Sequence, residues 1–104
     1  MTLDEFRATL LQPAAPKELP TGLRAMWEDG KGNWSGAHAI AQEIEDRTGS
    51  WIHAYLHRKE GDLANAGYWY RRAGKPAADD ALEEEWGRIV SSLLGAGLPV
   101  LDDK

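Results

Sequence analysis

The chain contains no cysteine and no long apolar segment, and each absence excludes a class of protein. Without cysteine it can form neither disulfides nor cysteine-ligated zinc sites, and it has no thiol nucleophile. No run of about 18 apolar residues is present, so we expect no membrane span. The opening sequence, MTLDEFRATLLQP, lacks the basic start and apolar centre of a secretory signal. Together these features predict a cytoplasmic protein.

Positive charge is also in short supply. The 104 residues include 12 Lys and Arg against 17 Asp and Glu, which gives a net charge of −5. A nucleic-acid-binding surface needs a positive excess, so we expect no nucleic-acid partner. The exception is residues 51–78, which carry five basic and two acidic residues. This basic island either neutralises the acidic segments on each side of it or forms an anion-binding surface.

The apolar residues recur at helical spacing, and the alternation typical of a strand never extends beyond a few residues. Thr2 and Glu5 form a capping box that predicts a first helix, and three prolines soon afterwards predict a linker. Cap residues and glycines divide the rest of the chain into further helices. The sequence therefore predicts an all-α single domain. Its segments are an N-terminal helix (1–12), a proline-rich linker (13–20), two helical hairpins (21–48 and 50–74) and a C-terminal capping helix (79–95).

Two boundaries and one face of these hairpins can be specified further. Gly49 should end the second helix of the first hairpin, and Ser50 should cap the helix that follows. In the second hairpin, Gly61 and Asp62 should form a tight turn. The helix after that turn should direct one apolar stripe toward the core, formed by Leu63, Ala66, Tyr70 and Ala73.

The two predicted hairpins resemble each other in sequence. When residues 25–37 are shifted by 29 positions onto residues 54–66, small residues and cap residues coincide. The coinciding pairs are Ala25 with Ala54, Gly32 with Gly61, Asn33 with Asp62 and Ala37 with Ala66. Such self-similarity is typical of helical-hairpin repeats, in which small residues allow neighbouring helices to approach closely.

The second hairpin resembles the tetratricopeptide repeat. Its sequence GDLANAGYWYRRA is similar to the signature of the second helix of that repeat. The matching positions are Gly61, Asp62, Leu63, Ala66, Tyr70 and Ala73, with Ala54 at the small-residue position of the first helix. The resemblance is close over residues 51–78 and looser over residues 22–48, and it implies a concave surface that binds a peptide or a protein. The segments AHAIAQ, HAYLHRKEGD and NAGYWYRRAG are also similar to a set of small bacterial proteins of unknown function.

His53, His57 and Glu60 follow one another at i, i+4 and i+7, so they lie on one face of a predicted helix. Two histidines at this spacing can chelate a metal ion, with Glu60 as a third ligand. His38, on the preceding helix, could approach the same face, depending on how the helices cross. In the alternative interpretation, the histidines form hydrogen bonds between helices at a half-buried interface.

Aromatic and arginine side chains form the other candidate surface. Tyr68 and Trp69 fall outside the core stripe of their helix and Arg72 lies nearby, a combination typical of interface hot spots. These residues can equally pack against the C-terminal helix. Arg58 can bind a carboxylate or phosphate, or it can pair with acidic residues of a neighbouring helix. No nucleophile elbow, phosphate loop or carboxylate-pair motif is present, so we predict no catalytic residue.

These patterns favour a non-catalytic interaction module that binds a peptide or protein partner, or a second copy of itself. We expect a groove lined by histidines, arginines and aromatic residues, namely His38, His53, His57, Arg58, Tyr68, Trp69 and Arg72. The alternative is a protein, or an enzyme, that binds a small anion or a metal ion in the same groove, with His53, His57 and Glu60 as metal ligands. We expect no cofactor and no membrane association.

Overall fold

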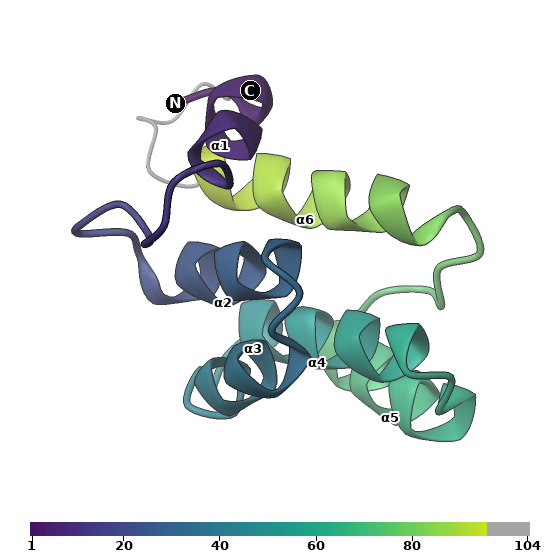
Figure 1. The fold of residues 1–104 in the computed structure, drawn as a ribbon. Coiled ribbons are helices and arrows are strands. Elements are labelled where there is room, and N and C mark those ends of the chain that lie inside the picture. Colours follow the sequence, from purple (N-terminus) through teal and green to yellow (C-terminus); the bar gives the residue numbers. More distant parts are fainter. Residues whose placement is uncertain (96–104) are drawn as a thin grey trace.

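The computed structural model describes residues 1–95 and contains six α-helices within them. They are α1 (Leu3–Thr9), α2 (Thr21–Gly30), α3 (Trp34–Ala41), α4 (Arg47–Lys59), α5 (Leu63–Ala73) and α6 (Leu82–Gly95). The described residues form no strand, which confirms the all-α prediction. In Figure 1, α1 and α6 lie on one side of the molecule and α2 to α5 on the other. Among these six helices, none combines the length and apolar composition of a transmembrane span.

Hydrogen bonds fix both ends of α1. The predicted capping box is present, because Thr2 Oγ1 accepts from the Glu5 amide and Glu5 Oε1 accepts from the Thr2 amide. The helix ends at Thr9 and does not extend to residue 12 as predicted, because the next three amides each donate three residues back and form a tighter turn. Lys31 Nζ donates to the carbonyls of Leu10 and Gln12, which joins the turn after α1 to the end of α2.

The turns that follow α2 and α4 have nearly the same conformation. Gly32 has a φ of +88° and Gly61 a φ of +91°, both in the left-handed region that favours glycine. The next residue, Asn33 or Asp62, caps the following helix with its side-chain oxygen, as predicted. Each turn folds one helix back along its predecessor, so α3 contacts α2 and α5 contacts α4 (Figure 1).

The predicted boundary at Gly49 and Ser50 is wrong. Asp46 is the N-cap of α4, and its carboxylate accepts from the Gly49 amide at 3.2 Å. Gly49 and Ser50 therefore lie inside the helix. A Cβ atom at position 49 would lie 2.1 Å from the Ile44 carbonyl oxygen, so glycine is required there by the close approach of the preceding loop. The second helical pair consequently begins at Arg47, and α3 is shorter than expected.

The core is arranged around α4, which contacts α2, α3, α5 and α6. Every residue from 49 to 57 is buried, as expected for a helix surrounded by neighbours. The largest fully buried apolar side chains from the other helices are Phe6, Met26, Ile89 and Val90. On α5, Ala66, Tyr70 and Ala73 are buried as predicted, but Leu63 is 68% exposed because it begins the helix beside the turn.

Candidate metal centre

The three histidines of the chain converge at one point. His38 lies on α3, and His53 and His57 lie one turn apart on α4. The Nε2 atoms of His38 and His53 are 3.0 Å apart. Each of the three rings offers a nitrogen within 4.8 Å of those of the other two. The sequence leaves the approach of His38 undecided, and the structure places it beside the other two histidines.

Ring packing fixes the orientation of this histidine cluster (His38, His53 and His57). The His53 and His57 rings are nearly parallel, with centroids 5.5 Å apart, and the His38 ring meets them edge-on. Trp34 connects α3 to α4, because its indole Nε1 donates to the Leu56 carbonyl at 2.7 Å. The Trp34 ring also stacks on His38. Sequence reasoning misses Trp34, although its i, i+4 spacing to His38 indicates a shared helix face.

Glu60 orients His57. The Nδ1 atom of His57 donates to Glu60 Oε2 at 2.7 Å, an arrangement that in the neutral ring places the lone pair on Nε2. The side-chain nitrogen of Asn65 (Nδ2) lies 3.5 Å from that Nε2, so Asn65 borders the cluster. Sequence reasoning also misses Asn65. Glu60, expected as a metal ligand, contacts Nδ1 of His57, and with His57 and Asp62 it forms a second group whose possible ligand atoms lie within 4.8 Å of one another. Carboxylates in this position orient histidine ligands in metal sites and raise their basicity.

Burial keeps two of the histidines neutral at ordinary pH. His53 is 5% exposed, and burial, followed by the influence of His38 and His57, lowers the pKa of His53 to about 4. Burial and then His57 also lower the pKa of the half-buried His38, against a smaller opposing effect of Glu60. Both rings therefore have an unprotonated nitrogen at neutral pH, which a metal ion requires.

Three of the predicted binding residues lie together beside this cluster. The Trp69 ring stacks on His53 with centroids 4.0 Å apart, and the Tyr68 ring meets Trp69 edge-on. Arg72 lies over both aromatic rings and donates to the Tyr68 hydroxyl at 3.0 Å. Tyr68 is 44% exposed. The structure thus forms one continuous arrangement that runs from the buried histidines to an exposed aromatic and arginine surface.

Arg58, the remaining predicted binding residue, binds partners that are not part of this cluster. Its guanidinium donates to Glu85 Oε1 at 2.8 Å and to the backbone carbonyl of Asp80. Burial opposes the charged form of Arg58, but the hydrogen bond and charge of Glu85 outweigh it and raise the pKa of the guanidinium. Arg58 is therefore held by α6 and the loop before it.

Glu85 is the centre of a second buried polar cluster, which sequence reasoning misses. Its side chain is fully buried and accepts from Trp51 Nε1 at 3.1 Å and from the Tyr70 hydroxyl at 2.7 and 2.8 Å, in addition to Arg58. Burial, followed by the hydrogen bond to Glu85, raises the pKa of Tyr70. The sequence carries one signal for this role: Glu85 lies four residues before Ile89, on the apolar face of α6.

Comparison of the chain with family models, with curated proteins and with solved structures gives no match.

Proposed function

We propose that this protein binds a single divalent transition-metal ion, of the zinc class, through His38, His53 and His57. The observation that carries the proposal is the convergence of three imidazole nitrogens from two helices within 4.8 Å. Three imidazoles without a thiolate suit Zn²⁺, Co²⁺, Ni²⁺ and Cu²⁺ better than Mg²⁺ or Ca²⁺, which prefer oxygen ligands.

The distances within the cluster support this assignment. Two nitrogen ligands at about 2.05 Å from a tetrahedral zinc ion lie roughly 3.3 Å apart, and the Nε2 atoms of His38 and His53 are separated by 3.0 Å. His57 presents its Nε2 because Nδ1 is occupied by Glu60. The nitrogen of His57 lies within 4.8 Å of the other two, and it would have to approach to about 3.3 Å to enter the same tetrahedral coordination sphere.

Three protein ligands leave the fourth position of a tetrahedral ion open to water or to an exogenous ligand. The ion would also join α3 to α4, and so link the two helical pairs. Such an ion stabilises the folded chain, since the unfolded chain does not hold the three histidines together.

A second candidate function, a peptide or protein interaction module in the cytoplasm, is favoured by the exposed surface of Tyr68, Trp69 and Arg72. Tyr68 is exposed and Arg72 lies over two aromatic rings. Tyrosine, tryptophan and arginine are the residues that dominate binding energy at protein interfaces. The tetratricopeptide-like sequence of α4 and α5 points to the same kind of partner.

The test of the metal proposal is a titration of chelator-treated protein with Co²⁺, followed by visible absorption, and then displacement by Zn²⁺. We expect one ion per chain and a spectrum typical of nitrogen ligation. His38→Ala is the diagnostic variant, because His38 is half-buried and is the only ligand on α3. It should weaken zinc binding by about 100-fold or more, since loss of even a supporting group behind a ligand weakens it by about 10- to 100-fold.

Glu43→Gln is the matched control, because Glu43 is exposed in the loop after α3. It should bind zinc as the wild type does. The proposal is wrong if His38→Ala retains wild-type zinc affinity, or if zinc in excess leaves the melting temperature of the wild type unchanged. Circular dichroism of each variant establishes that a lost affinity does not come from a lost fold.

A further inference from the structure

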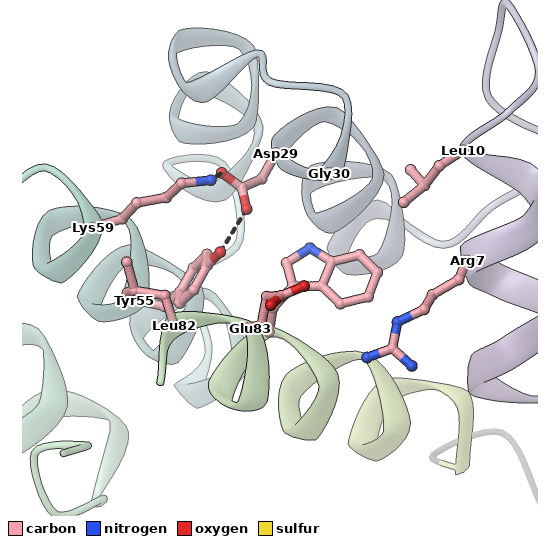
Figure 2. Close-up of a pocket in the computed structure, with 9 residues that line it drawn as sticks. Arg7, Leu10, Asp29, Gly30, Tyr55, Lys59, Leu82 and Glu83 are labelled. Atoms are coloured by element: carbon pink, nitrogen blue, oxygen red, sulfur yellow. Dashed lines mark hydrogen bonds and ion pairs between the residues drawn. The ribbon is translucent and has the colours of Figure 1, made fainter. Parts of the chain in front are cut away.

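A cavity of about 370 Å³ lies between α1, α2, α4 and α6, and it shares no lining residue with the histidine cluster. Its volume falls near the lower end of the range of roughly 300 to 1,000 Å³ that is usual for small-molecule sites. Figure 2 shows side chains from all four helices directed toward it, with Lys59 and Arg7 at opposite ends.

The aromatic wall of the cavity is rigid. The indole Nε1 of Trp86 donates to the Met26 carbonyl at 3.1 Å, and the Tyr55 hydroxyl donates to Asp29 Oδ2 at 2.7 Å. Trp86 is 7% exposed and Tyr55 2% exposed, so neither ring can turn freely. A wall that is already ordered lowers the entropic cost of binding a ligand.

The charges around the cavity balance. At one end, Lys59 Nζ contacts the buried Asp29 Oδ1 at 2.9 Å (Figure 2). At the other end, the Arg7 guanidinium lies 5.7 Å from the Trp86 ring centre and pairs only loosely, at 3.7 Å, with the fully solvated Asp4. The exposed carboxylate of Glu83 lies between these two ends in the view of Figure 2.

We infer that this cavity binds a small zwitterion with an apolar side chain, of the size of a free amino acid. A simple anion would be repelled by Glu83 and would gain little from Lys59, whose charge is already neutralised by Asp29. A simple cation would be repelled by Arg7. A zwitterion can direct its carboxylate to Arg7 and its ammonium to Glu83. Its apolar side chain would then lie against Trp86 and the two leucines of the lining, Leu10 and Leu82.

The test is calorimetric titration of the chelator-treated protein with three probes that differ only in charge. Phenylalanine is the zwitterion, 3-phenylpropanoate lacks the ammonium, and phenethylamine lacks the carboxylate. We expect phenylalanine to bind about 10-fold more tightly than either of the others, because each loses one charge-assisted hydrogen bond. Leucine should also bind, since the wall does not require a ring.

Two variants assign the contacts. Glu83→Gln should raise the Kd of phenylalanine by about 10-fold and should lower the Kd of 3-phenylpropanoate, because the repulsion by Glu83 is removed. Arg7→Gln should weaken the binding of phenylalanine and 3-phenylpropanoate and should strengthen the binding of phenethylamine, because the repulsion by Arg7 is removed. Both positions are exposed, so the fold should be retained, and Glu43→Gln is again the control. The inference is overturned if no probe binds at about 10 mM, if all three bind equally, or if both variants bind as the wild type does.

Discussion

Two of the buried polar clusters that involve α4 differ in how their hydrogen bonds are satisfied. The glutamate cluster (Glu85 with Trp51, Arg58 and Tyr70) brings three donors to one carboxylate. The histidine cluster brings three rings of the same kind together, and the Nε2 atoms of two of them face each other at 3.0 Å. The glutamate cluster pairs hydrogen-bond donors with an acceptor, whereas the histidine cluster consists of three identical rings.

This difference separates a structural element from a site. A buried carboxylate with a cation and two neutral donors satisfies its lone pairs within the protein. Facing imidazole nitrogens can share one proton between two rings, and the third ring contributes another lone pair. In the proposed function, a metal ion would be bound by one nitrogen of each of these three rings.

The largest expected effect is at the centre of the glutamate cluster. Glu85→Ala should lower the free energy of unfolding by about 3 to 5 kcal/mol, because it removes the nearest carboxylate from Arg58 and leaves two buried donors, on Trp51 and Tyr70, without an acceptor. Urea denaturation measures this change. Glu83→Ala, an exposed position two residues earlier on α6, should change stability by less than about 0.5 kcal/mol. A loss below about 1 kcal/mol for Glu85→Ala would mean that the cluster is not a stabilising unit.

The second prediction concerns pH and the metal-free protein. The pKa of His53 is about 4 in the folded chain, because burial and then His38 and His57 disfavour its charge, and the unfolded chain has the ordinary value of 6.5. Between these values the unfolded chain binds the extra proton, so acidification favours unfolding. Through His53 alone, the free energy of unfolding should fall by up to about 1.4 kcal/mol per pH unit below pH 6.5, and the lowered pKa of His38 adds to this fall.

Chelator-treated protein unfolded with urea between about pH 7 and pH 5 provides the measurement, since most carboxylates are still charged there. The groups that face His53 are His38 from α3, His57 from its own helix, and Arg72 from α5 through the Trp69 ring. None of these groups is acidic, so none would offset the loss. Stability that stays flat down to about pH 5 would show that the histidine cluster accepts protons without strain.

The third prediction concerns the carboxylate behind His57. Glu60→Gln should raise the Kd for zinc by about 10- to 100-fold, because the amide no longer holds the ring as a charged acceptor does. The metal-free protein should lose less stability than it does through Glu85→Ala, since the Glu60 side chain is 40% exposed. Calorimetry with Zn²⁺ measures the affinity and urea the stability. Equal affinities in wild type and variant would remove Glu60 from the site.

The sequence predicts those parts of the site that lie within one helix. His53 and His57 share a face because they are four residues apart, and Asp62 caps α5 because a cap is a local interaction. The convergence of His38 could not be predicted, since it depends on how α3 crosses α4. That crossing is set by the contact of Trp34 with α4, a hydrogen bond between residues 22 positions apart in the chain.

The partner of Arg58 could not be predicted either, because it also depends on how helices far apart in the sequence pack together. Arg58 directly follows His57, and successive helical side chains point about 100° apart. His57 belongs to the histidine cluster, whereas Arg58 pairs with Glu85, a residue 27 positions further along the chain. Glu85, a charged residue on the apolar face of α6, predicts that a buried cation lies beside it. The sequence does not show which basic residue that is.

The smallest expected effect comes from Arg88, which shares a partner with Arg58 but is half exposed. Its Nε and Nη2 atoms donate to the two carboxylate oxygens of Asp80 at 3.0 and 3.1 Å. Despite this good geometry, Arg88→Gln should lower the free energy of unfolding by only about 0.5 kcal/mol, because water and salt screen an exposed pair. Urea denaturation at low and high salt measures it, and the difference should vanish at high salt. If Arg88→Gln destabilised the chain as strongly as Glu85→Ala, the exposure of a polar pair would not determine how much it stabilises the fold. The loop at Asp80 would then have to be counted as part of the glutamate cluster.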